Sequence, residues 1–289
     1  MFKQQMATIQ PTLKKFFFAM ALLVSGMVVA WAQAVEEVPF ITSPDSVTQE
    51  MLRIANVGPN DHLIDLGSGD GRIVILAAKR HGASGLGVEV DPRLVQSSQQ
   101  NAQAAGVAQR VRFLEQDLFK TDLTPATVVT LYLLPDVNLK LRPSLLSLKP
   151  GTRIVSHDWD MGDWKPDQST VLNVPDKKVG LNKSSTVFLW RVPASIEGLW
   201  CGRGLLRGAS LQLSQRFQEY KGTLAYTARR DKLDLQGRIE GNLLRINAGR
   251  ADELLLEVTG NLMRIVSGLG DMALATGQSL FRFAGNECP

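Results

Sequence analysis

The chain has 289 residues and 44% of them are hydrophobic, which is enough for one large or two ordinary domains with packed cores. The formal net charge is +4, but the first 34 residues hold three lysines and no acid, which leaves +1 for the rest. This near balance, without a basic run to follow a phosphate backbone, excludes a nucleic-acid partner on charge grounds. Three histidines that lack ligand spacing and cysteine partners predict no metal site.

Residues 1–34 are predicted to be a processing segment. Lysines precede the apolar run 16–31, and the tripeptide that ends at Ala34 has the small-x-small pattern of a signal cleavage site. Cleavage there predicts an exported protein, periplasmic or secreted, that begins at Val35. The alternative is membrane association through an uncleaved run 16–31, although about 16 apolar residues are marginal for a bilayer span. Both alternatives place the body of the protein outside the cytoplasm, because the positive charges precede the run.

A helix is predicted to begin at Ser43-Pro44-Asp45. Serine and aspartate are favourable N-caps, proline suits the first turn, and apolar residues then follow at helical spacing. The helix is predicted to end before Gly58.

The stretch 62–91 organises the chain. A short apolar run meets Gly67, Gly69 and Gly71, after which apolar residues recur at helical spacing, so the pattern predicts strand, tight turn and helix. Glycines this dense indicate a backbone that adopts positive φ or approaches a ligand closely. The helix N-terminus that follows offers free N–H groups.

A second apolar run ends at Glu89, about 20 residues past the glycines, where a carboxylate at the end of the next parallel strand reaches a ribose. Dinucleotide folds use G-x-G-x-x-G, whereas this turn is Asp65-x-Gly67-x-Gly69-x-Gly71, with Asp70 inside it. Such acids repel a pyrophosphate and disfavour a nicotinamide oxidoreductase. They suit a cationic ligand such as S-adenosyl-L-methionine.

These residues carry a family resemblance. The turn Asp65 to Val74, together with the segment 38–44, resembles the class I (seven-strand) S-adenosylmethionine-dependent methyltransferases. Within that class it is similar to the protein-lysine methyltransferases of the ATP synthase c-subunit and the adenine nucleotide translocase and to their bacterial relatives. The resemblance covers about residues 38–165 and implies a Rossmann-like, doubly wound α/β sheet of seven strands. It implies cofactor contacts from Asp65, Gly67, Ser68, Gly69, Asp70, Gly71 and Glu89.

The resemblance implies further cofactor contacts outside the turn. Thr42 and Phe40 match a loop that covers the methionine end of the cofactor, with stapling of the helix start as the alternative role of Phe40. Asp117 matches an acid that accepts a hydrogen bond from the adenine amino group, and Leu118 matches the residue that packs on the ring. The alternative for Asp117 is a helix or turn cap.

Three residues are predicted to lie where the substrate that accepts the methyl group binds, which is called the acceptor side of the site. The buried strand 127–133 ends at Leu134-Pro135, where relatives that methylate amides or adenine carry Asn or Asp followed by Pro-Pro-Tyr/Phe, and that motif is absent. Tyr132 supplies the hydroxyl at this place, with a packed aromatic as the alternative. Residues 157–164 pack three acids, two tryptophans and a histidine after another strand, which suits a cationic lysine. Asp158 and Trp159 are the first candidates there, with solvated acids and a packed tryptophan as the alternative.

The pattern changes after residue 194. Residues 171–174 and 186–192 are predicted to complete the sheet with an antiparallel strand, and from Ser195 short alternating strands separated by glycines predict a small antiparallel all-β domain, a sandwich or a lipocalin-like barrel. The predicted domains are therefore 35–194 and 195–289. Cys201 and Cys288 fit one disulfide in an oxidising compartment, with two buried free thiols as the alternative.

Two hypotheses for function remain. The first is an S-adenosylmethionine-dependent methyltransferase whose expected substrate is protein lysine. Tyr132, Asp158 and Trp159 are its candidate residues at the reacting centre. The second is an exported, non-catalytic binding or scaffold protein that keeps a Rossmann-like pocket and binds a ligand through its β module. Neither the oligomeric state nor the ligand of that module follows from the sequence.

Overall fold

The computed structural model describes residues 41–177, 182–226, 232–247 and 253–289. The predicted signal segment 1–34, its apolar run 16–31 and Phe40 lie outside the described residues. Among the residues that are described, no helix has the length and apolar character needed to cross a bilayer.

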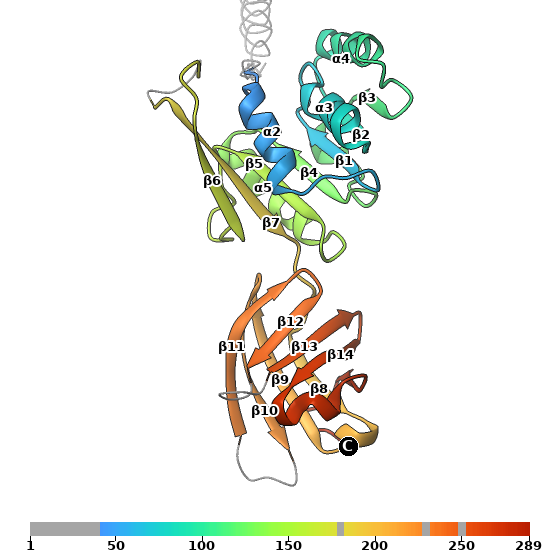
Figure 1. The fold of residues 1–289 in the computed structure, drawn as a ribbon, viewed down its shortest axis with the longest axis vertical. Helices are drawn as coiled ribbons and strands as arrows, with labels where there is room; N and C mark the ends of the chain where they lie inside the picture. The colour runs from blue at the N-terminus through green and yellow to red at the C-terminus, as the bar shows by residue number, and fades with distance from the viewer. Residues whose placement is uncertain (1–40, 178–181, 227–231, 248–252) are drawn as a thin grey trace, which may run out of the picture. The chain divides into compact units, whose positions relative to one another are not determined.

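The first part of the described chain forms a mixed sheet of seven strands in the order β3-β2-β1-β4-β5-β7-β6 (Figure 1). Strands β1 to β5 are parallel, and β7 is antiparallel to both β5 and β6. The strands are β1 (His62–Leu66), β2 (Ser84–Glu89), β3 (Val111–Glu115), β4 (Val128–Leu131), β5 (Arg153–His157), β6 (Gln168–Asn173) and β7 (Ser184–Arg191). This confirms the predicted Rossmann-like sheet with an antiparallel strand near its end.

Helices cover both faces of this sheet. Successive side chains of each strand point to opposite faces, so apolar residues on both faces need a covering layer. Leu63 of β1 packs in one core cluster with residues of α2 (Asp45–Ile54), α3 (Arg72–His81) and α4 (Pro92–Ala104). Its neighbour Ile64 packs in a second cluster with residues of α5 (Pro135–Leu146). Only the short 3₁₀ helix η1 (Leu118–Lys120) lies between β3 and β4 in the described chain.

The predicted capping of the first helix is wrong. The N-cap of α2 is Pro44, and no side chain caps the helix, so neither Ser43 nor Asp45 serves in that role. The amide of Thr48 instead bonds the carbonyl oxygen of Pro44 at 2.9 Å. Ser43 is buried, and its hydroxyl points to a distant partner that is described below.

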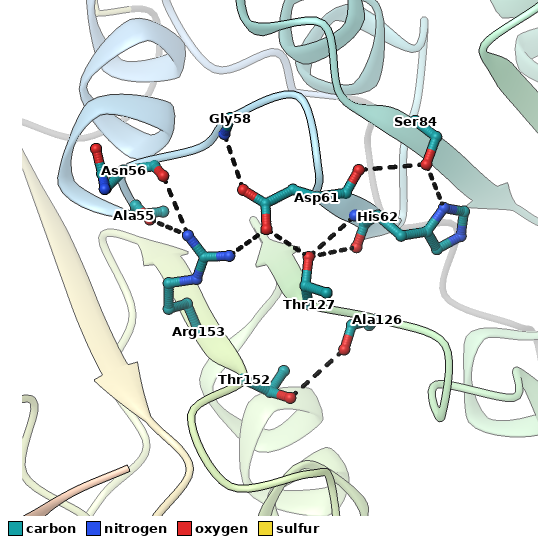
Figure 2. Close-up of polar contacts among 10 residues, drawn as sticks. All are labelled: Ala55, Asn56, Gly58, Asp61, His62, Ser84, Ala126, Thr127, Thr152 and Arg153. Carbon is teal, nitrogen blue, oxygen red and sulfur yellow. Dashed lines mark hydrogen bonds and ion pairs between the residues drawn. The ribbon is translucent and has the colours of Figure 1, made fainter. Parts of the chain in front are cut away.

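An ion pair at the amino ends of the parallel strands joins the sheet to the end of α2 (Figure 2). Arg153 at the start of β5 pairs with Asp61, which precedes β1, and donates a hydrogen bond of 2.7 Å to the carbonyl oxygen of Ala55. Asp61 also accepts hydrogen bonds from Thr127 Oγ1 at 2.7 Å and from the amide of Gly58 at 2.8 Å. Burial opposes ionisation, but these bonds and Arg153 lower the pKa of Asp61. The charged groups at the amino edge of the sheet therefore have partners within the chain. The carboxyl ends of the parallel strands lie at the opposite edge.

The second part of the described chain forms a closed antiparallel barrel of eight strands in the order β10-β11-β12-β13-β14-β15-β8-β9 (Figure 1). Of the two predicted architectures, the barrel is the one observed. Its inward side chains, among them Trp200, Leu211 and Leu256, form one buried apolar cluster, so side chains fill its interior. The strands are β8 (Gly198–Gly202), β9 (Ala209–Arg216), β10 (Glu219–Tyr226), β11 (Lys232–Glu240), β12 (Leu243–Asn247), β13 (Glu253–Thr259), β14 (Leu262–Leu269) and β15 (Ser279–Phe283).

The barrel is cross-linked by the predicted disulfide between Cys201 on β8 and Cys288 after β15. The two cysteines are 87 residues apart, and a loop of that length stabilises the fold by roughly 4 to 5 kcal/mol in the chain-entropy description. Beside the bond, the buried Trp200 donates its indole N–H to the carbonyl oxygen of Ile196 at 2.8 Å. The disulfide thus fixes the first and last barrel strands to each other. The domain boundary predicted after residue 194 falls between β7 and β8.

Candidate active site

The glycine-rich turn follows β1 and begins α3 at the carboxyl edge of the sheet. Gly67, Gly69 and Gly71 have φ values of 75°, 53° and 80°, so each adopts the left-handed conformation that glycine tolerates best. A Cβ at Gly67 would lie 2.9 Å from Leu133 Cδ2, so a side chain here would also require Leu133 to shift. The amides of Gly67 and Ser68 both donate to the carbonyl oxygen of Val88 at 2.9 Å, which holds the turn against β2.

Two acids predicted to bind the cofactor lie at this turn. Glu89 ends β2, and its carboxylate accepts a hydrogen bond of 3.0 Å from the amide of Gly69. Asp65 on β1 is only 2% exposed and accepts a hydrogen bond of 2.7 Å from Thr130 Oγ1 on β4. Burial is the main cause that raises the pKa of Asp65 to about 7, the charges of Glu89 and Asp70 raise it further, and the Thr130 bond opposes them. The structure therefore brings Asp65, Glu89 and Asp70 close enough for mutual repulsion.

Asp70 is held at the turn by Arg72. The guanidinium bonds both carboxylate oxygens of Asp70, at 3.0 Å from Nε and 2.7 Å from Nη2. The third arm of Arg72, Nη1, donates to the carbonyl oxygen of Ser43 at 2.9 Å. Asp70 thus stiffens the turn, and its predicted contact with the cofactor stays a prediction.

Asp117 acts as a cap. Its side chain accepts a hydrogen bond of 2.9 Å from the amide of Phe119 and so begins η1, the alternative considered for this residue. Leu118 packs, partly buried, against the cluster beneath β4. Thr42 is half-buried in the segment before α2. Contacts of Thr42, Asp117 and Leu118 with a cofactor remain predictions from the resemblance.

The acceptor-side candidates lie at the carboxyl ends of β4 and β5. The half-buried Tyr132 stacks on His157, with ring centroids 4.0 Å apart and 27° between the planes. Burial first, and the charge of Asp158 second, raise the pKa of Tyr132, so its phenol stays neutral. Strand alternation from Asp65 and its partner Thr130 places Tyr132 on the same face of the sheet. Asp65 at the cofactor turn and Tyr132 are therefore neighbours across β1 and β4.

Asp158 is predicted to position the acceptor lysine or to relay its proton, and this role stays a prediction. Its backbone has a φ of 61°, and its carboxylate is bonded to the amide of Thr186 at 2.9 Å and to Lys177 Nζ at 2.7 Å. Lys177 also donates to the carbonyl oxygen of Ser184 at 2.6 Å. Asp158 is thus held in place as the ion-pair partner of Lys177.

Trp159 is 42% exposed at the surface of the same loop. Its carbonyl oxygen accepts hydrogen bonds from Ser156 Oγ at 2.6 Å and from the buried amide of Asn138 at 3.3 Å. Trp159 is therefore exposed while its backbone is anchored to β5 and α5, and its contact with the acceptor stays a prediction.

Four residues that sequence reasoning did not assign complete this region. They are Ser43, Thr130, Lys177 and Ser185. Thr130 could have been identified from the sequence, since its position in β4 opposite Asp65 follows from the parallel register. The others depend on contacts between distant segments, and no local pattern reveals them.

In the described chain no group of three or more histidine, cysteine, aspartate or glutamate side chains is arranged to hold a metal ion.

Comparisons with known proteins identify the class. A family model described as the ANTKMT methyltransferase domain matches residues 65–168, which span the turn and the acceptor-side loop. A solved structure described as an RNA methyltransferase from Salinibacter ruber in complex with S-adenosyl-L-homocysteine has 51% identity and a TM-score of 0.50, over 54% of this chain and 96% of that one. The fold and the acids at its glycine turn thus define an S-adenosylmethionine-dependent methyltransferase.

Curated relatives give the family. A protein-lysine N-methyltransferase of Saccharolobus islandicus is 39% identical over 158 residues, which cover 54% of this chain and 94% of that protein. The lysine N-methyltransferase of Mus musculus that is named for the ATP synthase c-subunit is 34% identical over 135 residues, which cover 46% of this chain and 53% of that protein. The chain belongs to the protein-lysine N-methyltransferase family.

The residues at the turn fit S-adenosylmethionine as the cofactor. A buried carboxyl group with a raised pKa, beside two further acids, gains from a cationic ligand such as a sulfonium or an α-ammonium. Glu89 would hold the ribose, at the end of the strand after the turn. The cofactor supplies the methyl group when it is bound.

The pH dependence of cofactor binding tests the role of Asp65. A cationic ligand binds the ionised form of Asp65, and this form becomes populated as pH rises through the pKa of about 7. Affinity for S-adenosylmethionine is therefore expected to increase about fivefold between pH 6 and 7, with release of a proton. Calorimetry in two buffers of different ionisation enthalpy measures that proton. Asp65→Asn is expected to bind more weakly and without proton release; equal release by both proteins contradicts the assignment.

Proposed function

We propose that the acceptor of the methyl group is the side-chain amine of a protein lysine. The observation that carries the proposal is the neutral phenol of Tyr132, stacked on His157 beside the fixed carboxylate of Asp158 and on the same sheet face as Asp65. A lysine ammonium is attracted to aromatic faces. The names of the relatives from Saccharolobus islandicus and Mus musculus support the same acceptor.

The side chains have distinct tasks in this proposal. The lysine must lose a proton before its nitrogen can accept a methyl group, and transfer to the half-buried surface around Tyr132 favours the neutral amine. The phenol oxygen of Tyr132 then accepts a hydrogen bond from the amine and aligns its lone pair. The nitrogen–carbon bond forms as the carbon–sulfur bond breaks, the proton goes to water, and S-adenosylhomocysteine leaves. Catalysis by alignment and exclusion of water needs no strong acid.

RNA is disfavoured as the acceptor, although it is named for the Salinibacter ruber protein. The loop after β5 carries Asp158, Asp160 and Asp163, and acids at this position repel a phosphate backbone. Asp158 pairs with Lys177, and Asp163 pairs with Arg142 and Arg216. The carboxylate of Asp160 accepts a hydrogen bond from the amide of Gly162 and has no cationic partner among the described residues. The carboxylate of Asp160 therefore favours a cationic substrate over a phosphate backbone.

A transfer assay with labelled S-adenosylmethionine tests the proposal. The substrates are a synthetic peptide with one lysine between apolar residues, the same peptide with arginine in place of lysine, and an RNA oligonucleotide. Label is expected in the lysine peptide alone. Tyr132→Phe, which keeps the ring and loses the hydroxyl, is expected to lower kcat/KM about tenfold, the effect of one hydrogen bond, with cofactor affinity unchanged.

Two results contradict the proposal. Transfer of the label to RNA but not to the lysine peptide identifies RNA as the acceptor. Cofactor binding without transfer to any substrate, in protein of wild-type fold, supports the non-catalytic binding or scaffold protein instead.

We also propose that the protein is exported. The lysines before the apolar run 16–31, the small residues that end at Ala34 and the disulfide between Cys201 and Cys288 support an oxidising compartment outside the cytoplasm. Mass spectrometry of protein from fractionated cells is expected to find Val35 as the first residue. An intact N-terminus in the membrane fraction supports the anchor instead, and an intact N-terminus in the cytosol contradicts export.

A further inference from the structure

Ser43 is held from two sides by residues that belong to different halves of the site. Its backbone carbonyl oxygen accepts a hydrogen bond of 2.9 Å from Arg72, whose guanidinium is clamped on Asp70 in the glycine turn. Its hydroxyl lies 2.9 Å from Nδ1 of His157 at the end of β5. Ser43 is only 4% exposed, so water does not compete for these bonds. One buried residue thus connects the turn to the acceptor side.

His157 has no freedom to rotate without breaking a contact. The ring is fully buried, Nε2 lies 2.9 Å from Ser185 Oγ, and one face stacks on Tyr132. Asp158 Oδ2 is 3.4 Å from Nε2, and its charge favours a proton on that nitrogen. Nδ1 is then the acceptor of the Ser43 hydroxyl.

The ring is neutral in the physiological range. Burial is the main cause that lowers the pKa of His157 to about 4, Asp158 opposes this, and the charge of Lys177 adds to it. A neutral ring needs one hydrogen-bond donor and one acceptor around it. The two serine hydroxyls supply both.

We propose that Ser43 is a positioning residue that couples cofactor binding at the glycine turn to the placement of Tyr132, through Arg72 on one side and His157 on the other. The proposal rests on the cofactor site of the proposed function. Because Arg72 is bonded to Asp70, a ligand that shifts the turn shifts Arg72 with it, and Ser43 follows because its carbonyl oxygen is bonded to Arg72. Ser43 then orients His157, on which Tyr132 stacks. By linkage, an ordered acceptor side strengthens cofactor binding by the same factor.

The chain offers a matched pair of variants. Ser43→Ala removes the hydroxyl bond to His157 and leaves the backbone bond to Arg72. Ser185→Ala removes the other bond to the same ring but touches nothing that reaches the turn. Ser43→Thr restores the hydroxyl. A merely structural role for the ring makes both alanine variants behave alike.

The test uses the full chain and S-adenosylhomocysteine as the probe. Calorimetry first measures its binding to each protein. The Cε1–Hε1 resonance of His157, which is one of three histidines and is assigned by its loss in His157→Gln, is then followed as the probe is added. In the wild type, Ser185→Ala and Ser43→Thr the resonance is expected to shift at saturation. In Ser43→Ala the shift is expected to fall at least threefold although the probe still binds.

The outcomes separate the two claims. Absence of binding by the wild type overturns the cofactor site itself. Binding with an equal His157 shift in the two alanine variants overturns the coupling and leaves the site in place. If Ser43→Ala does not fold, Arg72→Gln cuts the same path at its other end, and an undiminished His157 shift in that variant also overturns the coupling.

Discussion

A carboxyl group buried in the middle of the sheet governs this site. Asp65 lies on β1, between β2 with Glu89 and β4 with Thr130, and its single hydrogen bond from Thr130 does not repay the loss of water. With two further acids nearby, the apoprotein bears an electrostatic strain that a positively charged ligand relieves.

The alternation of side chains along the strands places Asp65 on the same face of the sheet as the residues of the acceptor side. Asp65, Thr130 and His157 share the face covered by α2 and α3, whereas Ile64, Val129 and Ile154 pack on the other face with α5. Polar residues of three adjacent strands are thereby brought to one side of the carboxyl edge. The Asp61–Arg153 pair fixes the opposite edge, which keeps the strand ends in register where the chemistry takes place.

The sequence predicts well what local chemistry determines. Positive φ angles at Gly67, Gly69 and Gly71 follow from glycine in a strand–turn–helix pattern, and the place of Glu89 follows from the length of one βαβ unit. The period of two after residue 195 indicates the all-β part, and the paired cysteines fit its two ends. Each of these features depends on spacing along the chain.

Contacts between distant segments are beyond such patterns. Ser43 has the sequence of an N-cap, but its hydroxyl bonds a histidine 114 residues away, and Pro44 takes the cap position. Asp158 has the sequence of an open acidic loop, but Lys177 of the chain itself neutralises it. In both cases a buried polar group is satisfied by a partner that only the tertiary fold brings near.

A crystal structure of the full chain with S-adenosylhomocysteine tests the central claim most directly. The account predicts the ligand's α-ammonium within hydrogen-bond or ion-pair distance of Asp65, its ribose on Glu89, and its sulfur on the side of the turn that faces Tyr132. A ligand bound with its ammonium away from Asp65, or with its sulfur on the face covered by α5, would contradict the account.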